Sequence, residues 1–206
     1  GTVHLFEMEV PKSSEKFNEK PTAPKQITSG QFDIRGIAGH VGKTMIVSRG
    51  DMNQASEIYS VDLTDGTMKQ LSHANDQLYA SVKLGKVEKR ITTATDGAEL
   101  HSWVIYPPDF DPKKKYPTLL YCQGGPQGAL SQFYSYRWNF QLMAAHGYII
   151  IAPNRRGMPG YGVEWNEQIS KDYGGQNMDD YLSAIDDLAT EPYVDKERIG
   201  CIGASY

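Results

Sequence analysis

The last residues of the sequence have the types and the spacing that nucleophilic catalysis needs. A short apolar run, Ile199 to Ile202, leads into Gly203, and Ser205 follows two residues later. In a nucleophile elbow, written G-x-S-x-G, the serine stands on a sharp strand-to-helix turn whose strained backbone lifts the hydroxyl above the sheet. The printed sequence ends at Tyr206 and holds the first half of this pattern, and an ordinary strand-to-loop turn gives the same residues. Ser205 is therefore a candidate nucleophile that depends on support from upstream.

A glycine-rich stretch after an earlier apolar run offers the second part of such a site. This stretch is Gln123 to Pro126, and it contains Gly124 and Gly125. Backbone N–H groups of a glycine-rich loop can point at the carbonyl oxygen that becomes negatively charged during acyl transfer. We expect this loop and the turn at Ser205 to leave neighbouring strands and to converge. The expected donors are the N–H of Tyr206 and that of Gly124 or Gly125.

The sequence lacks a histidine in the place of a general base. An α/β-hydrolase carries its nucleophile, its acid and its histidine in that order along the chain. All five histidines precede Ser205: they are His4, His40, His73, His101 and His146. Without a base a serine hydroxyl is a weak nucleophile. We therefore expect these histidines to be structural, and the catalytic acid and base to lie downstream in a longer enzyme of which this sequence is the front part.

Residues 1–76 have the pattern of β structure. Strands are expected at residues 3–10, 32–38, 43–48, 57–63 and 68–71, with a polar loop from Pro11 to Lys25. Asp65-Gly66 between apolar runs is a strong hairpin signal, because both residues tolerate positive φ. Lys25 to Thr28 recurs as Lys69 to Ser72, at about the spacing of one propeller blade. We interpret residues 1–76 as the end of a β-propeller domain, and a small β-sandwich is the alternative.

From residue 77 the pattern changes to alternating strands and helices. A hairpin around Asp96-Gly97, parallel strands at 118–122 and 148–152, and helices at 131–146 and 177–190 are expected. The apolar stripe of the second helix consists of Met178, Tyr181, Leu182, Ile185, Leu188 and Ala189. This order predicts that residues 77–206 form the first half of an α/β-hydrolase, a doubly wound sheet truncated at the nucleophile elbow.

Composition and charge set several function classes aside. The 206 residues carry a net charge of -4 and no long basic stretch, which argues against nucleic-acid binding. No apolar run approaches the length of a membrane span, so no membrane partner is expected. Histidines and cysteines lack the close pairing of metal sites, and no cofactor is implied. Cys122 and Cys201 sit in apolar runs, and we expect buried free thiols in preference to a disulfide. Neither a signal peptide nor a lipid anchor is visible, so a periplasmic or cytoplasmic location is not readable.

Further motifs accompany the glycine loop and the candidate elbow. They are Asn154 to Gly162, Asp172 to Gly175 and Pro192 to Gly200. Together the set resembles the prolyl oligopeptidase family of serine peptidases, closest to its dipeptidyl peptidase branch, of the bacterial dipeptidyl peptidase V type, and to its acylaminoacyl peptidase branch. The resemblance covers nearly the whole chain, and family members place a β-propeller before an α/β-hydrolase domain.

The resemblance assigns roles to individual residues. Ser205 matches the family nucleophile, and Tyr206 matches the residue whose N–H helps to form the oxyanion hole and whose ring lines the pocket for the substrate side chain. Gly124 and Gly125 match the other oxyanion loop. Gln123 stands where the family more commonly has histidine, and either its amide donates to the oxyanion or it packs against the loop.

The resemblance also leaves several functions open. A serine exopeptidase that releases N-terminal dipeptides from short peptides is the first. An acylaminoacyl peptidase or oligopeptidase, an esterase, and a catalytically silent propeller-hydrolase that acts as a binding module are the alternatives. A homodimer of the full-length enzyme is left open.

The resemblance also includes an arginine in the loop after the run 148–152. Arg156 matches a family arginine there, and we expect it to form an ion pair or to anchor the loop in preference to contacting the substrate.

Overall fold

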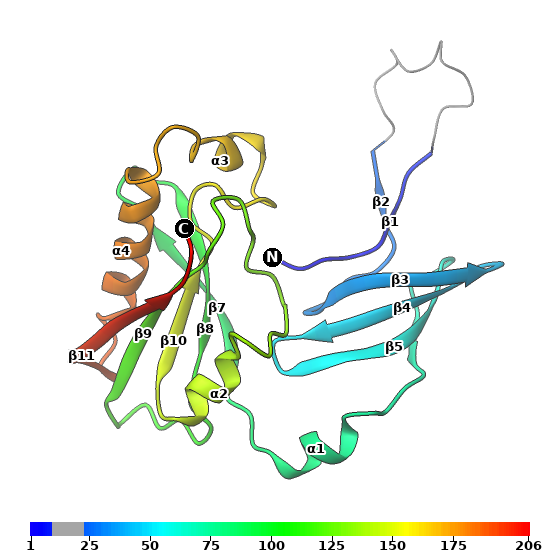
Figure 1. Cartoon of the computed structure of the whole chain (residues 1–206), viewed down its shortest axis with the longest axis horizontal. Coiled ribbons are helices and arrows are strands. Elements are labelled where there is room, and N and C mark those ends of the chain that lie inside the picture. The colour runs from blue at the N-terminus through cyan, green and yellow to red at the C-terminus, as the bar shows by residue number, and fades with distance from the viewer. Residues whose placement is uncertain (10–22) are drawn as a thin grey trace. The chain divides into compact units, whose positions relative to one another are not determined.

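The computed structural model describes residues 1–9 and 23–206, which form two compact units. The β unit consists of Thr2–Ser81 with Ser131–Tyr134, and the α/β unit of Val82–Leu130 and Ser135–Tyr206 with Gly1. Figure 1 shows the sheets of both units. The expected loop after Pro11 lies, as far as residue 22, outside the described residues.

The β unit contains strands at the four predicted places between residues 32 and 71, and the strand predicted at 3–10 is present only as the short β1. Its main sheet is antiparallel in the order β3-β4-β5-β6, with β3 at Asp33–Val41, β4 at Thr44–Asp51, β5 at Gln54–Asp62 and β6 at Met68–Gln70. Strands β1 (Phe6–Glu7) and β2 (Lys25–Gln26) form a second, two-stranded sheet, and helix α1 covers Asp76–Ser81. Residues 32–71 contain no helix, and the described part of the chain contains no closed propeller. The strand prediction is therefore confirmed at the level of single strands and one four-stranded sheet.

The sequence repeat corresponds to a repeat of hydrogen bonds. The side-chain amide of Gln26 donates to the carbonyl oxygen of Thr28 at 2.7 Å, and that of Gln70 donates to the carbonyl oxygen of Ser72 at 2.8 Å. The hydroxyls of Thr28 and Ser72 each accept a backbone N–H from the neighbouring strand segment, at 3.0 and 2.8 Å. Both segments therefore close their sheets in the same way, although they belong to different sheets.

A buried carboxylate ties residues 131–134 to the β unit. Asp33, 1% exposed, accepts the N–H of Val3 at 2.9 Å and that of Gln132 at 3.2 Å, and also accepts the hydroxyl of Ser131. Beside it lies an apolar core that consists of Leu5, Phe32, Ile34, Val47 and Val61. Asp33 thus accepts hydrogen bonds from backbone N–H and hydroxyl groups of segments that are far apart in the sequence.

This tie corrects the helix predicted over residues 131–146. The structure contains only the short helix α2, Phe140–Ala145, in that range. Ser131 and Gln132 bind Asp33 of the β unit, and the chain from 133 to 139 continues without a helix. Helix α2 begins later because Asn139 caps it, accepting the N–H of Leu142 at 2.9 Å.

The α/β unit is a five-stranded sheet in the order β11-β9-β10-β8-β7. The strands are β7 (Val87–Thr93), β8 (Glu99–Ile105), β9 (Tyr116–Cys122), β10 (Ile149–Pro153) and β11 (Val194–Gly203). Strands β9, β10 and β11 are parallel, and β7 and β8 form the predicted antiparallel hairpin. Helix α3 covers Val163–Glu167, and helix α4 covers Gln176–Leu188 and packs on β10. Every residue of β10 is buried, as a strand covered on both faces requires. None of the helices in the described ranges is long and apolar enough to cross a membrane.

Helix α4 presents a different face to the sheet from the one predicted. Tyr181, Ile185 and Leu188 are buried as expected, but Met178 and Leu182 are 47% and 53% exposed. Polar residues occupy part of the buried face in their place, and Asp180 is fully buried. The apolar stripe therefore predicted the presence of the helix correctly, but it predicted which residues face the sheet only in part.

The two cysteines are free, and the expectation that both are buried is wrong. Cys122 is half-buried, and burial raises the pKa of its thiol. Cys201 is exposed, as are most residues of strand β11 in this chain.

An ion-pair group joins β7 to helix α4. Arg90 Nε donates to Asp187 Oδ2 at 2.6 Å, and Arg90 Nη1 donates to Glu191 Oε1 at 2.8 Å. The Thr92 hydroxyl also donates to Asp187, at 2.8 Å. Asp187 thus joins the edge strand to the end of the helix through charge-assisted hydrogen bonds.

We expect the substitution Asp187→Asn to change the acid sensitivity of the fold. Arg90, with Thr92, holds the pKa of Asp187 below its ordinary value. The stabilisation is therefore fully present above the ordinary value, about pH 4, and is lost as the pH falls through the lower value of the folded state. The variant should melt about 1–3 °C below wild type at pH 7, and this difference should shrink below about pH 4.

The measurement is thermal unfolding of the full-length protein followed by circular dichroism across this pH range. Asp186→Asn is the matched control, because Asp186 is an exposed residue on the same turn of helix α4. A difference between Asp187→Asn and wild type that stays constant with pH would contradict the assignment.

Candidate active site

The register of two parallel strands brings the candidate site together. Gly203, the last residue of β11, pairs with Cys122, the last residue of β9. The turn that carries Ser205 and the loop that carries Gly124 therefore leave neighbouring strands at the same level of the sheet. Carboxyl ends of parallel strands are where open α/β sheets place their sites.

Glycine is required on both sides of this junction because the two chains nearly touch. A methyl carbon on Gly203 would clash with the carbonyl oxygen of Cys122 and would lie 2.9 Å from the Cys122 Cβ. A methyl carbon on Gly124 would clash with the carbonyl oxygen of Ala204 and would lie 3.2 Å from the Ser205 Cβ. The predicted convergence of the two loops is thus present in the structure.

Ser205 has a strained backbone. Its φ is +73°, in the left-handed region that residues with side chains rarely adopt. Two other non-glycine residues in the described ranges share a positive φ, Asp109 and Lys171. Such a conformation costs on the order of 1–3 kcal/mol and persists where the surroundings enforce it. The Ser205 side chain is also exposed, so the turn presents its hydroxyl to solvent.

Tyr206 is held by its hydroxyl. That hydroxyl donates to the carbonyl oxygen of Tyr173 at 2.7 Å and accepts from the side-chain amide of Asn177 at 2.9 Å. The rings of Tyr206 and Tyr173 meet edge to face, with 5.0 Å between their centroids. The residue after Ser205 is therefore held through its ring and its hydroxyl.

Gln123 begins the glycine loop and is bound through its backbone. Its carbonyl oxygen accepts the hydroxyl of Tyr181 at 3.4 Å. A methyl carbon on Gly128 would lie 3.6 Å from the Gln123 Nε2, which places the amide beside the returning loop.

Arg155 is a contributor to the site that the sequence analysis missed. Its side chain is completely buried, and its guanidinium donates to the carbonyl oxygens of Gly125 and Pro126, at 3.1 and 2.8 Å. The guanidinium carbon also lies 4.8 Å from the centroid of the Tyr206 ring. The available signal was its position in a loop that directly follows a buried strand, at the carboxyl edge of the sheet where α/β sheets place their sites.

Arg156 acts as a loop anchor, as predicted. Nη1 pairs with the buried Asp180 at 2.8 Å, and Nη2 pairs with Asp96, the tip of the β7–β8 hairpin, at 2.7 Å. Burial raises the pKa of Asp180, and the backbone N–H and charge of Arg156 oppose that rise. The guanidinium also lies 4.4 Å from the centroid of the Trp165 ring on helix α3. One side chain thus joins the loop to a hairpin and two helices.

The histidines have local partners. His146 Nδ1 lies 2.8 Å from the carbonyl oxygen of Leu142 at the end of helix α2, and His73 pairs with Asp76 at 2.8 Å. The ring of His101 stacks on Tyr161, with 5.3 Å between the centroids. These contacts agree with a structural role for His73, His101 and His146.

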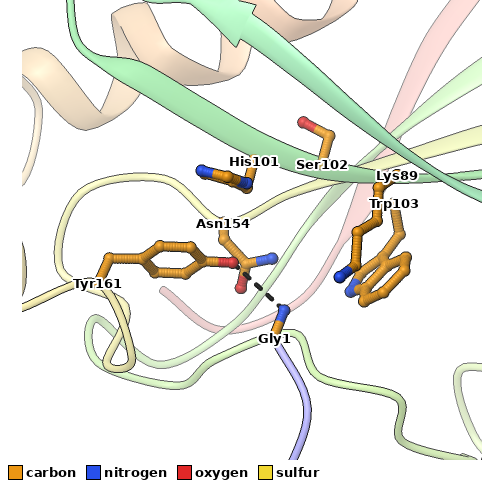
Figure 2. Close-up of a pocket in the computed structure, with 7 residues that line it drawn as sticks. All are labelled: Gly1, Lys89, His101, Ser102, Trp103, Asn154 and Tyr161. Atoms are coloured by element: carbon orange, nitrogen blue, oxygen red, sulfur yellow. Dashed lines mark hydrogen bonds between the residues drawn. The ribbon is translucent and has the colours of Figure 1, made fainter. Parts of the chain in front are cut away.

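A separate small pocket lies in the α/β unit (Figure 2). Its volume is about 140 Å³, and its lining includes Lys89, His101, Ser102, Trp103, Asn154 and Tyr161. The buried Ser102 hydroxyl has no hydrogen-bond partner among the described residues. None of the residues predicted for the active site lines this pocket. Within the described ranges, no group of three histidine, cysteine, aspartate or glutamate side chains is arranged to hold a metal ion.

A strained serine after one parallel strand and a glycine loop after its neighbour are the features of an α/β-hydrolase nucleophile elbow. Comparison with known proteins agrees with this class. Residues 134–206 match the model of the prolyl oligopeptidase family. The chain belongs to that family.

Two curated relatives are similar over most of the chain. The dipeptidyl-peptidase 5 of Porphyromonas endodontalis is 48% identical over 182 residues, and that of Porphyromonas gingivalis is 49% identical over 182 residues. Both alignments cover 88% of this chain and 26% of the relative, so the chain spans about a quarter of the length of these proteins. A solved structure of Pyrococcus horikoshii acylaminoacyl peptidase matches with a TM-score of 0.81 and 28% identity, over 100% of this chain and 30% of its own.

We expect Gly124→Ala to disable the serine. The added methyl group would push against the carbonyl of Ala204 and displace the turn or the glycine loop. Loss of one oxyanion donor typically costs about 100- to 1000-fold in rate. The rate at which a fluorophosphonate probe labels Ser205 in the full-length protein should therefore fall by about 100-fold or more.

Gly128→Ala is the control in the same loop. A methyl carbon there would lie 3.5 Å from the Gly124 carbonyl oxygen, an ordinary contact. This variant should label at the wild-type rate. Equal labelling rates for Gly124→Ala and wild type would show that the close approach has no bearing on the serine.

Proposed function

We propose that this chain is part of a serine peptidase that cleaves short peptides by acyl transfer through Ser205. The observation that carries the proposal is the left-handed backbone of Ser205, φ +73°, at the end of β11 and against Gly124. Family membership supports the reaction class. Because the chain spans about a quarter of its relatives, the proposed activity is that of the longer protein.

In the proposed reaction the Ser205 hydroxyl oxygen attacks the peptide carbonyl carbon, and a general base takes the hydroxyl proton. The N–H of Tyr206, with that of Gly124 or Gly125, stabilises the resulting oxyanion. The C–N bond then breaks, the same base returns its proton to the leaving amine, and water hydrolyses the ester. By the residue order of α/β-hydrolases, the base and its acid partner follow the nucleophile in the chain.

The proposed product is a dipeptide released from a free N-terminus. The names of the relatives at 48% and 49% identity support this choice. Release of an acylated amino acid is the second candidate, favoured by the likeness to the Pyrococcus acylaminoacyl peptidase. Short peptides are the substrates in both cases.

We also propose that residues 1–76 are the end of a β-propeller and residues 77–206 the first half of the peptidase domain. The matching hydrogen bonds of Gln26 and Gln70 support two consecutive blades, because both close the outer edge of a sheet in the same register. The sheet β3-β4-β5-β6 has the strand number and order of one blade. A propeller of this kind would keep long chains away from Ser205 and admit only short peptides.

The test compares the full-length wild type with Ser205→Ala on paired chromogenic dipeptide substrates that differ only in a free or an acetylated N-terminus. We expect wild type to prefer the free terminus and Ser205→Ala to lose several powers of ten in kcat. Ser183→Ala, on helix α4, is a control that should keep wild-type kcat.

Each other outcome has a defined meaning. Substantial turnover by Ser205→Ala would remove this serine from the mechanism. Preference for the acetylated substrate would move the assignment to the acylaminoacyl class. A folded wild type that hydrolyses neither substrate and resists fluorophosphonate labelling would replace the peptidase with a binding module.

A further inference from the structure

Arg155 is an unusual buried charge. Its side chain is 0% exposed, and among the residues that the structure describes no carboxylate lies within ion-pair distance of it. Burying a cation without an anion is costly, and such groups are retained where they meet strong compensating contacts. The contacts of Arg155 are carbonyl oxygens, a phenol and aromatic rings.

Two of the four hydrogen bonds that the Arg155 side chain makes within the described ranges are with the glycine loop. Arg155 Nη2 donates to Gly125 O at 3.1 Å, and Nη1 donates to Pro126 O at 2.8 Å. Nε donates to the Tyr181 hydroxyl at 3.2 Å, which donates in turn to Gln123 O at 3.4 Å. One guanidinium therefore fixes three carbonyls of the loop, two directly and one through Tyr181.

The same guanidinium also touches the other side of the site. Its carbon lies 4.8 Å from the centroid of the Tyr206 ring, within the range of a cation–π contact. Burial raises the pKa of the Tyr206 phenol, and the charge of Arg155 opposes that rise, so its field reaches this residue. Arg155 thus contacts both segments that would supply the oxyanion donors.

We propose that Arg155 is a positioning residue that holds the two halves of the oxyanion hole, the Gly124–Gly125 loop and Tyr206, in register with each other. This inference rests on the proposed function. Consecutive glycines have the widest backbone freedom of any residues. The Gln123 carbonyl, which Arg155 holds through Tyr181, lies in the same peptide plane as the Gly124 N–H. The Gly125 carbonyl, which Arg155 holds directly, lies in the peptide plane after that of the Gly125 N–H, so Arg155 fixes the planes on both sides of that group.

Arginine suits this role better than lysine. A guanidinium is planar and presents several donors in a rigid fork, whereas an ammonium is a compact point charge. The neighbouring Arg156 pairs with two carboxylates, Asp96 and Asp180, and in the described part of the chain its side chain makes no hydrogen bond to the glycine loop. Arg155→Lys therefore keeps the positive charge and removes the planar set of donors. A change in kcat in this variant reports the loss of positioning and not the loss of charge.

The test is steady-state kinetics of full-length Arg155→Lys and Arg155→Met on the free-terminus substrate of the proposed reaction. We expect kcat to fall about 10- to 100-fold in Arg155→Lys with KM within about twofold of wild type, because a misplaced donor is felt in the transition state. The inhibition constant of a peptidyl aldehyde, which mimics the oxyanion, should rise by the same factor. Arg90→Lys, which changes an arginine between β7 and helix α4, should keep wild-type kcat.

The outcomes separate this inference from the proposed function. An inactive Ser205→Ala together with Arg155→Lys at wild-type kcat would overturn the role of Arg155 alone. An active Ser205→Ala would overturn the proposed function. A rise in KM at unchanged kcat would make Arg155 a substrate-binding group, and failure of both Arg155 variants to fold would assign it to the fold; either result overturns the positioning role.

Discussion

The close approach of β9 and β11 at their carboxyl ends is the constraint on which the candidate site depends. Gly203 and Gly124 lie where any side chain would collide with the backbone of the opposite segment. The chain after β11 therefore has no room for a gradual turn, and Ser205 takes the left-handed conformation that follows. The candidate site thus depends at once on the parallel register, on the two glycines and on the strained serine.

The loop after β10 stabilises this arrangement through two adjacent arginines with opposite surroundings. Arg156 meets carboxylates on the β7–β8 hairpin and on helix α4, and its charge is balanced there. Arg155 donates to carbonyl oxygens of the loop after β9 and lies beside Tyr206, and no carboxylate among the described residues pairs with it. Of two adjacent arginines, one therefore joins structural elements and the other contacts the candidate site.

Much of this architecture could be predicted from the sequence because local patterns determine it. Apolar runs and Asp-Gly turns predicted the strands. The glycines predicted the two loops, after β9 and after β11, that lie against each other. The helix over 131–146 failed because Asp33, distant in the sequence, binds Ser131 and Gln132, and a single sequence carries no signal for such a contact. The orientation of helix α4 and the distinct roles of Arg155 and Arg156 also depend on which partners the fold brings near.

The pairing of β11 with β9 has a consequence for the order of folding. These strands are separated by β10 and three helices along the chain, so their contact is non-local and its loop-closure entropy is large. Local hairpins such as β7–β8 form sooner than a parallel pair of this kind. We therefore expect the backbone geometry of Ser205 to form late in folding, after the local hairpins, because it depends on the β9–β11 register. Until that register forms, we expect Ser205 to have the properties of an ordinary serine.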